Sequence, residues 1–104
     1  MRPNIDYIKK LADGSIEFEL KMIKILKEEY PKEKEKFLEY FENDSLMKAA
    51  DLIHKIKHKF SMLGMEDEYM FSVDFEEQVR AGNIVNYPDF LAILNITDNY
   101  IKEL

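Results

Sequence analysis

Apolar residues recur at spacings of three and four along almost the whole chain, and this helical period restricts the fold more than any other feature. Ile16, Leu20, Ile23 and Leu26, for example, would lie along one side of a single helix. No stretch alternates apolar and polar residues between turn residues, as a half-buried strand would. Three glycines and three prolines are also too few for the turns of a small all-β domain. The sequence therefore predicts an all-α fold.

Six helices are expected, each bounded by a capping residue, a glycine or a proline. They begin at Asn4, after the N-cap Ser15, at Pro31, after the turn ending at Ser45, at Glu66 and at Pro88. The first ends at Ala12, the fourth at about Leu63 before Gly64, and the fifth at Ala81. Four longer helices with one apolar face each predict an antiparallel up-and-down four-helix bundle with a short extra N-terminal helix. Its 104 residues correspond to one domain, residues 1–104.

The charge balance excludes several classes of partner. Fifteen basic and 21 acidic residues give a formal net charge of -6, without a basic stripe that would neutralise nucleic acid or an anionic membrane. The chain has no cysteine, and no apolar run approaches the roughly 18 residues of a membrane span. The N-terminal residues lack the apolar segment of a signal peptide. We expect a cytoplasmic, monomeric protein that binds neither nucleic acid nor membrane, and its methionine start and complete helices favour a stand-alone chain.

The segment from residue 49 to residue 64 contains the side chains that are most suited to a chemical role. On a helical wheel, Ala49, Leu52, Ile53, Ile56, Phe60 and Leu63 cluster on one side, which predicts the buried face. His54 and His58 then face solvent. Lys57 and Ser61 lie three and seven residues after His54 and are expected to border the same exposed patch. Met47 and Met62 share this face about two turns before and after His54, and methionine adapts its shape to a partner.

This segment resembles the signature of histidine-phosphotransfer (HPt) domains. In that family the phosphorylated histidine is followed by an apolar residue, a lysine at +3, a small residue at +4 and an apolar-glycine pair at +9 and +10. The corresponding residues here are His54, Ile56, Lys57, His58, Leu63 and Gly64. The resemblance continues through Phe75-Glu76-Glu77 and Arg80-Ala81-Gly82-Asn83, and through the order and lengths of the helices.

The resemblance implies a phosphocarrier of a multistep phosphorelay, and not an enzyme in the strict sense. His54 would accept the phosphoryl group, and Lys57 would offset its charge. Met47, His58, Ser61, Met62 and Gly64 would form the docking face for a receiver domain. The implied partners are a response-regulator receiver domain and a hybrid or sensor histidine kinase. No cofactor is expected on this chain, since the receiver domain would bring the aspartate and the magnesium ion.

Two positions depart from the family pattern. The +4 position is usually glycine, where a small residue lets the partner approach the imidazole closely, and His58 occupies it here. The residue before the histidine is often alanine and here is Ile53, which the wheel places in the core. These departures bear on the choice of partner more than on the chemistry.

Two alternative functions remain open from the sequence. His54 and His58 are four residues apart on one helical face, a spacing that suits two zinc ligands, and Glu76 or Glu77 could complete such a site. Alternatively, the chain is a non-catalytic helical interaction bundle in which both histidines are incidental.

Overall fold

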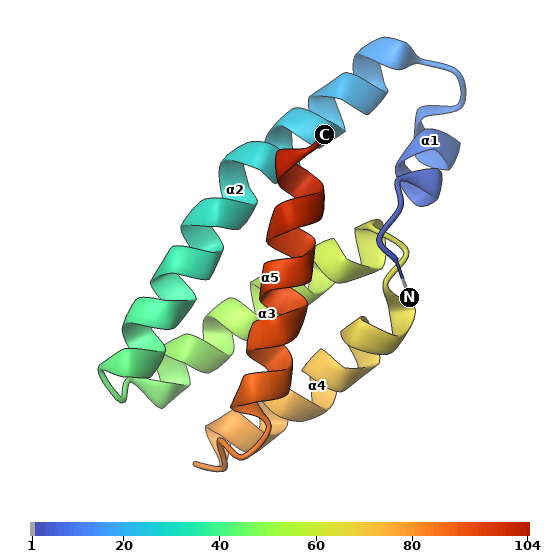
Figure 1. The fold of residues 1–104 in the computed structure, drawn as a ribbon. Coiled ribbons are helices and arrows are strands. Elements are labelled where there is room, and N and C mark those ends of the chain that lie inside the picture. The colour runs from blue at the N-terminus through green and yellow to red at the C-terminus, as the bar shows by residue number, and fades with distance from the viewer. Residues whose placement is uncertain (1) are drawn as a thin grey trace.

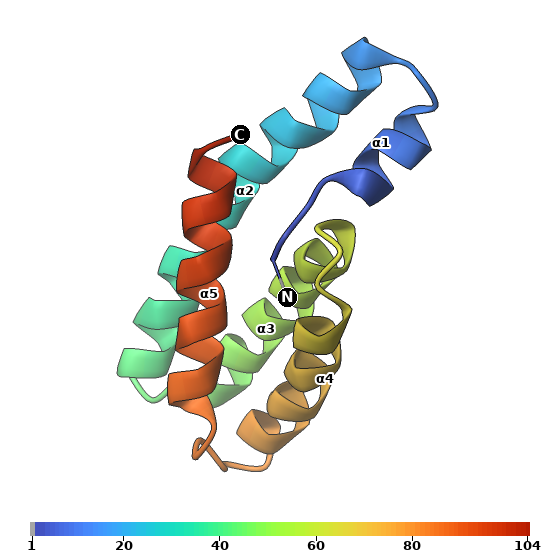
Figure 2. The ribbon, with the colours of Figure 1, turned by 45° about the vertical axis from the view of Figure 1, so that its right-hand side comes forward.

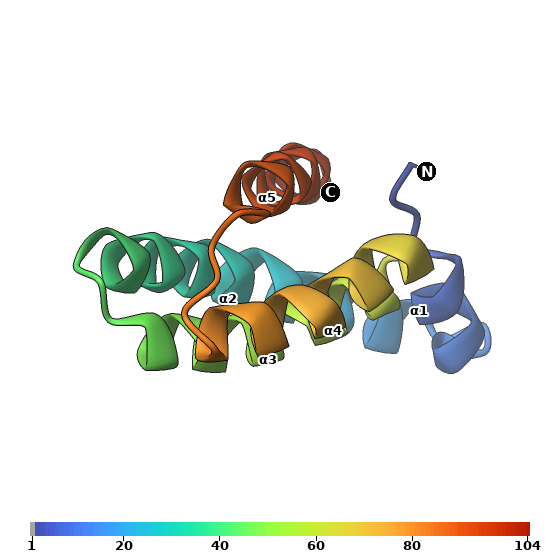
Figure 3. The same cartoon turned by 90° about the horizontal axis from the view of Figure 1, so that it is seen from below.

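The computed structural model describes residues 2–104, and every regular element in that range is a helix. The helices are α1 (Asp6–Ala12), α2 (Ile16–Glu42), α3 (Leu46–Met62), α4 (Glu66–Arg80) and α5 (Tyr87–Lys102). α3 lies beside α2 on one flank and beside α4 on the other (Figure 1). α5 forms a second layer over these helices and contacts α2 and α4 (Figure 3). The prediction of an all-α helical bundle is confirmed.

One aromatic ring of α5 connects the three helices beneath it. The ring centroid of Phe90 lies 5.1 Å from that of Phe37 on α2, 6.2 Å from Phe60 on α3 and 4.9 Å from Phe75 on α4. All four rings are buried in one continuous hydrophobic core. Aromatic side chains bury large apolar areas, so this cluster contributes strongly to the packing of α5 on the other helices.

The prediction that a new helix begins at Pro31 is wrong, because α2 continues through this residue from Ile16 to Glu42. Proline removes one intrahelical hydrogen bond, which weakens a helix interior. Ion pairs on both sides of Pro31 attach this helix to α3. Nζ of Lys59 on α3 pairs with Glu29 at 3.1 Å and with Glu33 at 2.9 Å. The chain therefore forms five helices over residues 2–104, where the sequence indicated six.

The N-terminal helix is shorter than predicted, since α1 begins at Asp6 and not at Asn4. Asn4 instead precedes the helix, and its side-chain oxygen accepts a hydrogen bond from the backbone N–H of Asp6 at 3.1 Å. Its own backbone N–H donates to the carbonyl of Leu63 at 2.9 Å, which fastens the N-terminal segment to the end of α3. α1 and the first turns of α2 extend past the end of the other helices (Figure 2).

The turns follow the expected residues more closely. The side chain of Ser15 caps α2 by accepting a hydrogen bond from the N–H of Phe18 at 3.2 Å. Gly64 follows Leu63, the C-cap of α3, and adopts a left-handed conformation with φ of +71°, as predicted. Pro88 occupies the first turn of α5, which begins one residue before it. Across the described residues, none of the five helices has the length and apolar content that a bilayer crossing requires.

Candidate functional site

His54 lies in the middle of α3 and points away from the core, as predicted. Its side chain is 56 % exposed, whereas Ile53 and Ile56 are fully buried. The buried face of α3 also matches the helical-wheel prediction in full, since all of the following are buried: Ala49, Leu52, Ile53, Ile56, Phe60 and Leu63. The apolar stripe thus fixes the rotation of α3 about its axis and leaves the imidazole accessible.

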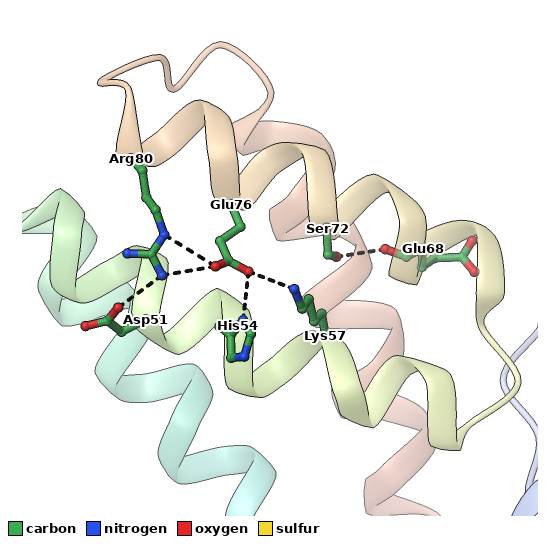
Figure 4. Close-up of polar contacts among 7 residues, drawn as sticks. All are labelled: Asp51, His54, Lys57, Glu68, Ser72, Glu76 and Arg80. Atoms are coloured by element: carbon green, nitrogen blue, oxygen red, sulfur yellow. Dashed lines mark hydrogen bonds and ion pairs between the residues drawn. The ribbon is translucent and has the colours of Figure 1, made fainter.

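Glu76 of α4 joins the charged groups around His54 (Figure 4). Its Oε1 lies 3.3 Å from Nδ1 of His54 and accepts a hydrogen bond from Nζ of Lys57 at 3.0 Å. Its Oε2 accepts two hydrogen bonds from Arg80, from Nε at 3.3 Å and from Nη2 at 3.0 Å. Glu76 is buried, and these contacts engage both of its carboxylate oxygens.

Arg80 extends this network back to α3. Its Nη2 also donates to Oδ1 of Asp51 at 3.1 Å, one helical turn before His54. Glu76 and Arg80 are four residues apart on α4, so their side chains lie on the same face and pair across one turn. The network contains two carboxylates, one ammonium and one guanidinium, and its formal charges cancel.

The charge of Glu76 decides which ring nitrogen of His54 carries the proton. Burial opposes its ionisation, but the hydrogen bonds from Lys57 and Arg80 outweigh burial and lower the pKa of this carboxyl below its ordinary value. Glu76 is therefore ionised at neutral pH and can only accept hydrogen bonds. The neutral imidazole of His54 then carries its proton on Nδ1, and the lone pair resides on Nε2.

The prediction that Lys57 borders the exposed patch is wrong. Lys57 is only 8 % exposed, because its ammonium turns toward α4 and pairs with Glu76. Its Nζ also lies 6.0 Å from the ring centroid of Tyr69, another residue of α4. The helical wheel placed this residue at the border of the buried face, and the acidic partner on α4 draws the long side chain inward.

Of the other predicted site residues, two are exposed and three are half-buried. His58 and Met47 are exposed on the face of α3 that carries His54, and Met47 is 57 % exposed. The ring centroid of His58 lies 5.2 Å from that of His54 and 6.1 Å from that of Tyr69. Ser61 is half-buried and donates a hydrogen bond to Oε1 of Glu66 at 3.3 Å.

Met62 and Gly64 depart from the expected docking face. Met62 is half-buried and packs against the hydrophobic core. Gly64 lies ten residues after His54, about 15 Å along a helix axis. A β-carbon built on Gly64 would come within 2.7 Å of Nδ2 of Asn4. The side chain of Asn4, from the N-terminal segment, therefore occupies the space beside this glycine.

The zinc alternative lacks a ligand set. Among residues 2–104, no group of three or more histidine, cysteine, aspartate or glutamate side chains is arranged to hold a metal ion. Glu76, which the sequence offered as a third ligand, pairs with Lys57 and Arg80, and Glu77 is exposed on the neighbouring position of α4. The structure therefore gives this alternative no support.

Sequence reasoning assigned Glu76 to a family pattern and to the zinc alternative, but not to a role beside His54. The two residues are 22 positions apart, and only the packing of α3 against α4 brings them together. One signal was present in the sequence, since a glutamate among the apolar residues of α4 has an arginine four positions later. No family model, curated protein or solved structure matches this chain.

Proposed function

We propose that this protein is a histidine phosphotransfer protein, which carries a phosphoryl group on His54 between receiver-domain aspartates of a multistep phosphorelay. The observation that carries the proposal is the pairing of the exposed His54 ring with Glu76 through Nδ1. This hydrogen bond would fix the tautomer and leave the lone pair on Nε2, the nucleophilic nitrogen, in a side chain that is 56 % exposed.

The bonds and protons of the transfer step balance without a further group on this chain. Nε2 of His54 attacks the phosphorus of an aspartyl phosphate, a nitrogen–phosphorus bond forms, and the bond from phosphorus to the aspartate oxygen breaks. The aspartate leaves as a carboxylate, so no proton has to be supplied. The reverse step returns the phosphoryl group to another aspartate.

Glu76 supports this step through charge. When Nε2 forms its bond to phosphorus, the ring acquires positive charge, and its N–H on Nδ1 becomes a stronger donor. A carboxylate that already accepts this hydrogen bond stabilises the developing charge without reorganising. A carboxylate on the far ring nitrogen orients metal-binding histidines in the same way.

Lys57 and Arg80 act on His54 through Glu76 in this proposal. Their hydrogen bonds keep the Glu76 carboxyl ionised and hold it in place. The sequence assigned Lys57 to the phosphate itself, but its ammonium is engaged by Glu76. We therefore propose Lys57 as a positioning residue for Glu76.

The wider expectations from the sequence form part of the same proposal. Helices α2 to α5 would follow an antiparallel up-and-down order, since short turns join α2 to α3 and α3 to α4. The receiver domain would dock over Met47 and His58 and contribute the aspartate and its magnesium ion. The chain would act in the cytoplasm as a one-domain monomer, supplied by a hybrid or sensor histidine kinase.

The test is transfer from purified, phosphorylated receiver domains. Incubation should place an acid-labile, base-stable phosphate on the protein, and His54→Gln should abolish it, while His58→Ala should retain it. A label that follows His58 would shift the site by one turn. No label with any receiver of a broad panel would contradict the proposal and leave the interaction bundle as the better interpretation.

A further inference from the structure

A phosphoryl group on His54 would need a positive charge nearby, and the two cations that contact Glu76 beside His54 are already paired. Phosphate monoesters and related groups carry nearly two negative charges at neutral pH. Lys57 is buried against Glu76, and Arg80 is shared between Glu76 and Asp51. Since the formal charges of that network cancel, it supplies little net attraction to a dianion outside it.

His58 is the ionisable group that shares the exposed face of His54. It follows His54 by four residues, which places both rings on one side of α3. The ring centroids lie 5.2 Å apart with an angle of 84° between the ring planes. A phosphoryl group bonded to a ring nitrogen of His54 can span this separation. Within residues 2–104, no hydrogen bond or ion pair engages His58.

From this geometry we infer that His58 is the phosphate-binding residue of the phosphorylated protein. Its imidazolium form donates a hydrogen bond to a phosphoryl oxygen on His54 and stabilises the phosphohistidine. The inference rests on the proposed function and assigns to His58 the charge-offsetting role that the sequence gave to Lys57. It also gives a reason for a bulky residue at a position where a small one would allow closer docking.

The neighbours of His58 come from α3 and α4. On α3 its neighbours are His54 one turn before it and the exposed Lys55, which lies about 60° away from His58 around the helix. From α4, the packed neighbour is Tyr69, whose ring centroid is 6.1 Å away. Glu76, which contacts Nδ1 of His54, is neutralised by Lys57 and Arg80. A phosphoryl group would thus be the main new charge near His58.

The experiment compares free and phosphorylated protein, with phosphoramidate as the donor to histidine. Ring nitrogen chemical shifts report the ratio of charged to neutral His58 at pH 7. Phosphorylation of His54 should raise that ratio about threefold or more, since a dianion at this distance favours the imidazolium even with solvent screening. An unchanged ratio on a protein labelled at His54 would overturn the inference and leave the proposed function standing.

The second measurement is the lifetime of the phosphohistidine between pH 6 and 8. His58→Gln keeps a hydrogen-bonding side chain but cannot be protonated, so the lifetime at pH 6 should fall at least about twofold, with less effect at pH 8. Lys55→Gln, which removes a permanent charge from the residue after His54, is the matched control, and any effect on the lifetime should be the same at pH 6 and at pH 8. Equal lifetimes for wild type and His58→Gln, or equal losses in both variants, would overturn the assignment. Failure to label His54 at all would remove the proposed function together with this inference.

Discussion

Oε1 of Glu76 on α4 lies 3.3 Å from Nδ1 of His54 on α3, and the same oxygen accepts a hydrogen bond from Lys57. Two residues of the helix that carries the imidazole therefore converge on one carboxylate of the neighbouring helix. This relationship couples the chemistry of His54 to the packing of α3 against α4. Changes at Glu76 or Lys57 should consequently affect both reactivity and stability.

Replacing Glu76 by glutamine should slow phosphorylation of His54 about tenfold. The amide can still occupy the space, but it exchanges a charge-assisted hydrogen bond for a weaker neutral one. Single-turnover transfer from a phosphorylated receiver measures the rate. Nitrogen chemical shifts of the His54 ring provide the readout that a merely structural role would not change, since the proton should move in part from Nδ1 to Nε2. A wild-type tautomer with a wild-type rate would contradict the assigned role.

Replacing Lys57 by methionine should destabilise the fold by about 1–3 kcal/mol at pH 7, because it leaves part of a buried carboxylate unpaired. The sign of the pH dependence follows from Glu76, whose pKa is lowered in the folded protein. Its pairing stabilises the fold above the unfolded-state pKa near 4.3, and the contribution is lost as the pH falls through the lower folded-state pKa.

The difference in unfolding free energy between wild type and Lys57→Met should therefore be largest above about pH 6 and shrink in acid. Urea unfolding at several pH values measures it. Lys55→Met is the control, since this exposed lysine has no ion pair among the described residues and should change stability by less than about 0.5 kcal/mol. A pH-independent difference would exclude Glu76 as the source.

Glutamate at Met47 should slow transfer from a receiver and leave stability nearly unchanged, since Met47 is exposed beside the proposed docking face. Glutamate at Met62 should instead destabilise the fold, by about 1–3 kcal/mol, because this side chain packs against the core. Thermal unfolding and transfer kinetics on both variants separate the two effects. Unaltered transfer in a folded Met47→Glu protein would remove Met47 from the docking face.

Alanine at Gly64 should cost more stability than alanine at Gly82. Both glycines have positive φ, +71° and +84°. A residue with a β-carbon is strained in this left-handed conformation, so each substitution should cost about 1 kcal/mol of stability. Only Gly64 has a side chain, Asn4, within 2.7 Å of the added β-carbon. The combination of Asn4→Ala with Gly64→Ala should recover the difference, which a double-mutant cycle of unfolding free energies measures. Equal losses of unfolding free energy at the two glycines would show that the Asn4 side chain moves aside at no cost.

The helices themselves could be predicted from the sequence, with one failure that has a physical reason. Pro31 is compatible with the first turn of a helix, and local signals favoured that position. The ion pairs from Lys59 to Glu29 and Glu33 connect residues on either side of the proline to α3, and these pairs are invisible without the packing of α2 on α3. Tertiary contacts here outweigh a local preference.

Local periodicity alone determined the all-α fold, the buried stripe of α3 and the exposure of His54, because the direction of a side chain on a helix follows from its position in the sequence. The tertiary structure alone decided that Lys57 turns inward and that Glu76 holds Nδ1 of His54. Those choices depend on which charges the neighbouring helix presents at separations of 19 and 22 residues, and helical spacing contains no information about either pairing.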